Sequence, residues 1–165
     1  MKQNSSIKEQ SLHPEQVAKA HPANTRQAAE SKDKCVEELD ERICTALSAA
    51  SDKKAQEMIV LDLREVANFT DYFLITSGTN PRQVQAIADE IVEQLKKQGT
   101  RAARIEGYQT AEWVLVDYGD FVVHVFEDKA RRFYDLERLW REAGRVPLPA
   151  GLVEPDAGSL RSLES

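Results

Sequence analysis

The chain has 165 residues but only three histidines and two cysteines, and no apolar run of the roughly 18 residues that a membrane-spanning helix needs. Hydrophobic residues make up 41% and charged residues 30% of the chain, which are ordinary globular proportions. The opening stretch, MKQNSSIKEQSLHPEQ, lacks the apolar segment of a secretory signal. We therefore expect a water-soluble, cytoplasmic protein with one domain of ordinary size.

The two cysteines, Cys35 and Cys44, are nine positions apart in a segment whose apolar residues recur at helical spacing. On one continuous helix they would lie about 13 Å apart along the axis, which is too far for a disulfide. Neither has a His or Cys neighbour at metal-ligand spacing. The sequence therefore predicts two small, unpaired core residues and no metal site.

Acidic residues are concentrated in the middle of the chain. The formal net charge is −6 overall, with +2 in residues 1–34, −6 in 35–145 and −2 in 146–165. A protein that grips nucleic acid through phosphates needs a positive surface. We therefore expect no binding to DNA, at most peripheral contact with RNA, and no membrane partner.

Both ends of the chain are predicted to be disordered tails. Residues 1–33 are polar and show no sustained hydrophobic period, and residues 146–165 are rich in proline and glycine. The predicted domain therefore covers residues 34–145.

Hydrophobic periodicity predicts an alternation of helices and strands in this domain. A helix is expected over 33–51, strands over 58–63 and 72–77, a second helix between Asn80-Pro81 and Gly99, and a weak edge strand over 100–106. A hairpin follows, and Asp128 then caps a last helix whose Phe133, Leu136, Leu139 and Trp140 face inward. This order predicts a single α/β domain with a mixed sheet of about five strands and flanking helices.

The hairpin, WVLVDYGDFVVHVFE at residues 113–127, is the most apolar run of the chain. A two-residue turn at Gly119-Asp120 pairs Tyr118 with Phe121 and places Tyr118 and the alternate valines on one face, the expected core side. Alternation forces the remaining pairs onto the other face. They are Trp113 with Phe126, Leu115 with His124, and Asp117 with Val122.

This second face is open to two interpretations. Either a helix covers it and His124 is hydrogen-bonded in the interior, or it is a protein-binding surface, because Trp, Tyr, Phe and Arg are enriched at interface centres. The first turn of the last helix carries Lys129, Arg131 and Arg132 near the positive end of the helix dipole. These cations are expected to pair with nearby Asp128, Asp135 or Glu127, or to contact a partner's carboxylates or phosphate.

Signals for catalysis are sparse. There is no GxGxxG, Gly-Lys-Ser phosphate loop, HExxH or Asp-x-Asp pair, and nothing in the spacing of Asp62, Asp71 and Asp117 requires them to converge. The stretch SGTNPR at 77–82 could hold an anion at a helix N-terminus, but the pattern favours a capped strand-to-helix turn. We expect no enzyme activity and no cofactor.

Several of these motifs together resemble the Iojap family, the ribosomal silencing factors called RsfS. FTDYF, SGTNPRQV, the Trp-x-Leu-x-Asp strand, GD-x-VVH-x-F and the closing Tyr-x-Leu-Glu-x-Leu-Trp occur in the family's order across residues 36–145. The resemblance implies a nucleotidyltransferase-like fold without the catalytic carboxylates. It also implies binding to the large ribosomal subunit through its fourteenth protein, which blocks joining of the small subunit and represses translation under nutrient limitation.

The same resemblance suggests where the partner binds. The expected contacts are Trp113, Leu115, Asp117, Tyr118 and His124 of the hairpin, with Arg131 and Arg132 as a basic rim. Because Tyr118 points to the core face, it either contacts the partner or supports the contact from the core side. Two other functions stay open at this point. The chain could be a nucleotide-binding or nucleotidyltransferase-like enzyme that uses SGTNPR. Alternatively, the second, largely apolar face of the hairpin could pair two copies into a homodimer.

Overall fold

A computed structural model describes Cys35 and residues 39–149 of the chain. The predicted N-terminal tail and most of the predicted C-terminal tail lie outside these residues. The strands are β1 (Gln56–Asp62), β2 (Tyr72–Gly78), β3 (Arg104–Glu106), β4 (Trp113–Asp117), β5 (Phe121–Glu127) and β6 (Gly144–Arg145). The helices are α4 (Glu41–Asp52), α5 (Pro81–Lys97), α6 (Asp128–Tyr134) and α7 (Leu136–Leu139).

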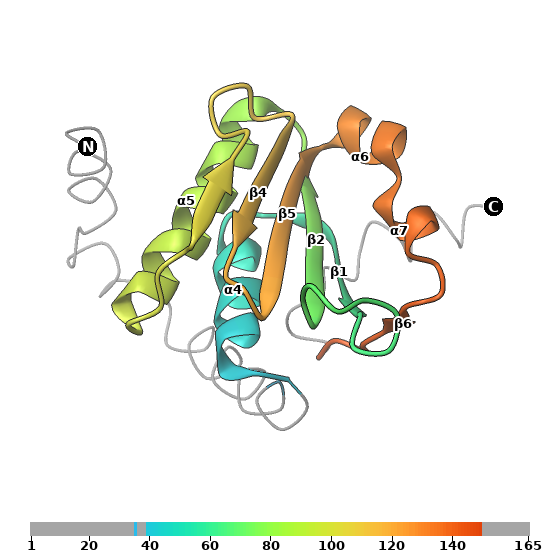
Figure 1. Ribbon diagram of the computed structural model, residues 1–165. Coiled ribbons are helices and arrows are strands. Elements are labelled where there is room, and N and C mark those ends of the chain that lie inside the picture. Colours follow the sequence, from blue (N-terminus) through green and yellow to red (C-terminus); the bar gives the residue numbers. More distant parts are fainter. Residues whose placement is uncertain (1–34, 36–38, 150–165) are drawn as a thin grey trace.

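The strands form one mixed sheet in the order β3-β4-β5-β2-β1-β6, in which β2 and β5 run parallel and the other paired strands of the described chain run antiparallel. Helices α4 and α5 cover one face of this sheet, and α6 and α7 lie on the other side (Figure 1). The predicted α/β fold with a mixed sheet is thus confirmed. The sixth strand, β6, was not predicted because two residues give no periodic signal.

The inner core lies between the sheet and helices α4 and α5. From the helices it takes apolar side chains such as Ile43, Leu47, Ile87 and Ile91, each almost inaccessible to solvent. From the sheet it takes the alternate valines of β4 and β5, as predicted. Burying large apolar side chains of this kind contributes roughly 1.5 to 3 kcal/mol each, so this layer supplies much of the stability.

The hairpin has the predicted register. The Tyr118 N–H donates to the carbonyl of Phe121 at 2.9 Å, and β4 pairs with β5 so that Leu115 lies opposite His124 and Asp117 opposite Val122. Gly119 makes the tight turn possible because its φ of 87° lies in the left-handed region that glycine adopts without strain.

Helix α5 begins as predicted. The Asn80 side chain accepts a hydrogen bond from the Gln83 N–H at 2.9 Å, and Pro81 occupies the first turn. The Gln83 side chain in turn accepts from the backbone N–H of Thr79 at 2.7 Å. SGTNPR is therefore a capped strand-to-helix turn whose first donors are satisfied by the chain itself.

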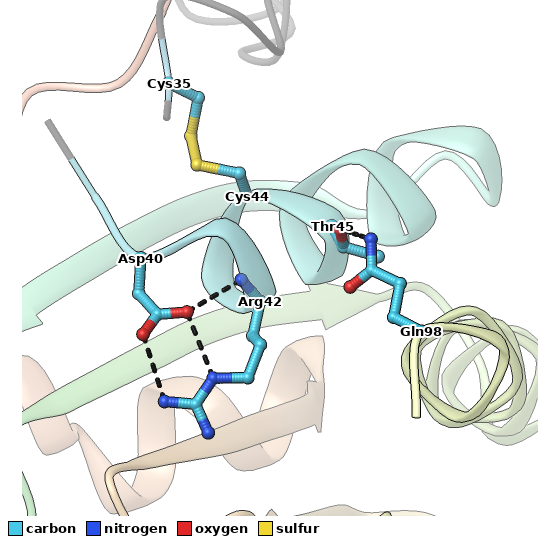
Figure 2. The surroundings of a disulfide bond; sticks show 6 residues. All are labelled: Cys35, Asp40, Arg42, Cys44, Thr45 and Gln98. Atoms are coloured by element: carbon cyan, nitrogen blue, oxygen red, sulfur yellow. Dashed lines mark hydrogen bonds and ion pairs between the residues drawn. A yellow bond between two sulfur atoms is a disulfide. The ribbon is translucent and has the colours of Figure 1, made fainter. Parts of the chain in front are cut away.

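The first helix differs from the prediction. It begins at Glu41 instead of near Asp33, because Asp40 interrupts the helical run and caps α4 by accepting from the Arg42 N–H at 2.8 Å. The bend lets Cys35, which precedes it, return to the start of α4. Cys35 and Cys44 form a disulfide across a Cα separation of 5.8 Å (Figure 2). The prediction of unpaired cysteines was wrong because it assumed one straight helix.

The end of the domain also differs. The chain takes a left-handed conformation at Asp135, with φ of 48°, and this breaks the predicted last helix into α6 and α7. Leu136 is buried as predicted, but Phe133 and Leu139 are 80% and 70% exposed, so the prediction that they face inward was wrong. Helix α6 starts after Glu127 with no side-chain hydrogen bond at its cap, so the prediction that Asp128 caps this helix was wrong. Beyond β6, the Val146 N–H donates to the Val60 carbonyl at 2.9 Å.

The Cys35–Cys44 disulfide should stabilise the start of α4. Closing a loop of this length removes entropy from the unfolded chain worth about 2 to 3 kcal/mol. We expect a reducing agent to lower the free energy of unfolding, measured by urea denaturation, by up to that amount. Cys35→Ser should be less stable than the oxidised protein and insensitive to reductant. Equal stability with and without reductant, in protein shown by mass spectrometry to be oxidised beforehand, would contradict the prediction.

Candidate functional site

A row of aromatic rings crosses the outer face of the sheet, opposite α4 and α5. It begins at Phe69 in the β1–β2 loop, which contacts Phe73 and Trp140, and continues through His124, whose ring lies 4.4 Å edge-on from Phe73. It then passes through Trp113 to Tyr134 at 4.8 Å, and ends at Phe133 of α6. Residues from the loop, three strands and α6 thus make one continuous row of aromatic contacts.

His124 occupies the middle of this row and is 3% exposed. Its Nδ1 accepts a hydrogen bond from the Trp113 Nε1–H at 3.0 Å, while its Nε2 has no partner among the described residues. Burial lowers the pKa of His124 to about 4, although the nearby Asp117 carboxylate acts in the opposite direction. The ring is therefore neutral at pH 7, and the interpretation of His124 as an interior, hydrogen-bonded residue is confirmed.

This buried imidazole should make the protein sensitive to mild acid. Its pKa is lower in the folded protein than the usual 6.5, so the unfolded chain binds the extra proton first as pH falls. Protonation of the unfolded chain therefore leaves the free energy of unfolding unchanged above about pH 6.5 and lowers it progressively as the pH falls towards 4. Between pH 6.5 and 4.5 we expect a loss of about 2 to 3 kcal/mol from this group. Urea denaturation at several pH values measures it.

His124→Phe is the control because it keeps an aromatic ring and removes the proton. Its stability should fall less over the same pH range, and the difference between the two proteins isolates His124 from the carboxylates that titrate nearby. Identical pH dependence in both proteins would show that the imidazole is not held neutral.

The hairpin residues expected to meet a partner differ in exposure. Trp113, Leu115 and Asp117 are partly exposed along β4 on the outer face. Asp117 accepts from the Gly119 N–H at 2.8 Å and has Arg104 at 3.6 Å, which leaves its second oxygen only loosely paired. Tyr118 lies on the opposite face, buried and stacked on Phe121, and burial raises the pKa of its hydroxyl. The expectation of direct contact through Tyr118 and His124 therefore disagrees with their burial.

Arg131 does not form the exposed rim that the sequence suggested. It is 5% exposed, pairs with Glu137 of α7 at 3.2 Å and donates to the Ser77 hydroxyl at 3.2 Å. Arg131 pairs with an acidic residue, as expected, but that residue is Glu137 and not Asp128, Asp135 or Glu127. Arg131 thus fixes the α6–α7 segment to the sheet, and Arg132 alone of the two arginines is exposed.

Sequence reasoning missed the exposed apolar residues at the two ends of the aromatic row. Phe69 is 61% exposed at one end, and Phe133 and Leu139 lie at the other beside the half-exposed Tyr134. Helical periodicity placed Phe133 and Leu139 in the core because it could not detect the break at Asp135. A large apolar surface of this kind on a folded domain indicates a binding site.

Catalytic features are weak in the described residues. Asp62 is engaged by Arg64 at 2.7 Å, and in the part of the chain that the structure describes no group of three or more His, Cys, Asp or Glu side chains could hold a metal ion. The three aspartates considered from the sequence therefore do not form a metal-binding cluster. None of the described helices is long and apolar enough to cross a membrane.

Comparisons with known proteins agree with this arrangement. A ribosomal silencing factor RsfS from Halalkalibacterium halodurans is 45% identical over 103 residues, which cover 62% of this chain and 88% of that protein. RsfS from Bacillus subtilis is 44% identical over 107 residues, covering 65% and 91%. A crystal structure from Bacillus halodurans superposes with a TM-score of 0.60 at 42% identity, covering 67% of this chain and all of that one.

The model of one protein family covers most of the domain and extends past it. Residues 36–162 match the family described as ribosomal silencing factor during starvation. Most of the motifs that suggested this family in the sequence lie on elements that build the outer face, and SGTNPRQV forms the turn into α5. The chain therefore belongs to the RsfS family of ribosomal silencing factors.

Proposed function

We propose that the chain, acting in the cytoplasm, binds the fourteenth protein of the large ribosomal subunit with its outer face and thereby blocks joining of the small subunit. Repression of translation is then steric and needs no enzymatic step. The observation that carries the proposal is the aromatic row, which presents partly exposed Trp113 at its centre and exposed apolar side chains at its ends.

The division between exposed and buried residues gives each a separate role in this proposal. Trp113, Leu115 and Asp117 contact the fourteenth protein, and exposed Arg132 lies at the edge of this surface, outside that contact. His124 supports Trp113 from below through the 3.0 Å hydrogen bond, and Tyr118 supports the hairpin from the core side. A central aromatic residue held in one orientation by its neighbours is typical of interface hot spots, because little side-chain entropy is lost on binding.

Charge favours a basic protein as the partner. The hairpin carries Asp117, Asp120 and Glu127 and no Lys or Arg, and the second oxygen of Asp117 has Arg104 at 3.6 Å. Ribosomal proteins are rich in Lys and Arg because they lie on RNA phosphates. A partly exposed carboxylate at the rim of an apolar patch then contributes orientation and association rate through a Lys or Arg of the partner.

Subunit joining tests the function directly. Purified bacterial subunits are mixed with and without the protein at a magnesium concentration at which they normally associate, and are then separated on a sucrose gradient. We expect the subunits to stay apart and the protein to sediment with the large subunit. Normal joining with the protein at the top of the gradient would refute the proposal. A dimer seen by light scattering that persists on the gradient would favour self-association of the outer face.

Two variants at the hairpin test the proposed site. Trp113→Ala combined with Asp117→Ala should abolish co-sedimentation with the large subunit, while circular dichroism shows a retained fold. Because Trp113 also contacts Tyr134 and His124, Asp117→Asn is the milder variant that changes only charge, and it should weaken binding roughly tenfold. The matched control, Asp120→Asn, removes an exposed carboxylate three residues away that pairs with Arg42. Equal effects of Asp117→Asn and Asp120→Asn would argue against the site.

The alternative function is nucleotide binding at SGTNPR. It is disfavoured because the Asn80 and Gln83 side chains already accept the hydrogen bonds that an anion would take. Isothermal titration calorimetry with ATP and magnesium should therefore give no binding heat. Saturable heat that Asn80→Ala changes would revive the enzyme hypothesis.

A further inference from the structure

The α6–α7 segment carries a basic groove that the binding of a basic protein does not use. Although the domain is acidic, residues 128–145 contain six basic and four acidic residues. Three arginines line an open groove of about 690 Å³ together with Phe133 and Leu139, and they are Arg132, Arg138 and Arg141. Figure 1 places this segment at the edge of the molecule, beside the outer face.

The three arginines are available for a partner. Each is exposed, and none has a side-chain hydrogen bond or ion pair with another described residue, although Asp135 and Glu142 line the same groove. Their neighbour Arg131, in contrast, is buried, pairs with Glu137 and donates to the Ser77 hydroxyl. Arg131 therefore holds the structure together, whereas Arg132, Arg138 and Arg141 are exposed to solvent.

We propose that this groove binds ribosomal RNA at the edge of the site on the large subunit, with Arg132, Arg138 and Arg141 on phosphates and Phe133 against a base or sugar. This inference rests on the proposed function and adds a second class of contact to it. The planar guanidinium group matches a phosphate with two parallel hydrogen bonds. The Phe133 side chain is 80% exposed, so its ring is accessible for stacking.

The charge pattern favours RNA over a second protein contact. A basic ribosomal protein attracts Asp117 but would repel three exposed arginines, so the two surfaces require partners of opposite charge. They are nevertheless adjacent, because Trp113 of the hairpin contacts Tyr134 of α6 with ring centroids 4.8 Å apart. A basic protein embedded in RNA offers both charges within such a short distance.

Binding measured at several salt concentrations tests the proposal. The full chain with Arg132, Arg138 and Arg141 all changed to Gln is compared with the wild type for affinity to purified large subunits and, separately, to the purified fourteenth protein. Loss of three phosphate contacts should weaken subunit binding and reduce the slope of log affinity against log salt by roughly two to three. Affinity for the isolated protein should not change.

A matched control carries Arg82→Gln, Lys97→Gln and Arg101→Gln, which remove the same charge from exposed positions on and just after α5. Identical behaviour of the two triple variants would overturn the proposal, because only net charge would then matter. An equal loss of affinity for the subunit and for the isolated protein would also overturn it and assign the groove to a protein contact.

A direct probe separates this inference from the proposed function. If the wild type fails to bind subunits at all, the proposed function fails, and a labelled single-stranded RNA of 12 nucleotides then decides about the groove. Fluorescence anisotropy at low salt should show binding by the wild type that the groove variant loses and the control retains. No RNA binding by the wild type in that case would overturn the inference as well.

Discussion

The pairing of β4 with β5 decides which side chains reach each face of the sheet. Because side chains alternate along a strand, a shift of one residue would move Trp113 and His124 into the inner core and bring the valines out. The hydrogen bond from the Tyr118 N–H to the Phe121 carbonyl and the left-handed Gly119 fix the register at the turn. The parallel pairing of β5 with β2 then brings Phe73 beside His124, so the aromatic row depends on the same register.

The α6–α7 segment holds the side chains of the outer face in place but covers this face only in part. The α6–α7 segment packs against Phe126 through Tyr134, yet it is short and leaves Phe133 and Leu139 in solvent. A longer helix would have covered this surface and removed it from binding. The left-handed turn at Asp135 prevents that, and the Arg131–Glu137 pair holds the two short helices in place. The structure thus keeps an apolar surface exposed while fixing the side chains that form it.

The sequence predicted most of the fold because its signals were local. The caps at Asn80 and the turn at Gly119-Asp120 each involve a few neighbouring residues, and strong alternation then fixed the register of β4 and β5. The errors came from long-range or competing effects. The helical period of the residues around Asp40 obscured its capping signal. The sequence therefore predicted one continuous helix, and on that helix Cys35 and Cys44 were too far apart to pair. Burial of Arg131 depended on Glu137 and Ser77, whose positions local sequence does not reveal. The residues proposed to bind followed from the family resemblance together with face alternation, but their exposure required the structure.

Orientation matters for a repressor that works by occupying space. A single apolar patch can bind in several rotations about its normal, and only some of them would place the domain in the path of the other subunit. Two adjacent surfaces of opposite charge restrict that rotation, because reversing them would put Asp117 against phosphates and the arginines against a basic protein. In the proposed complex the contact between Trp113 and Tyr134 joins these surfaces rigidly. The acidic hairpin and the basic groove then act as one two-part recognition element that sets the direction in which the domain projects from the subunit.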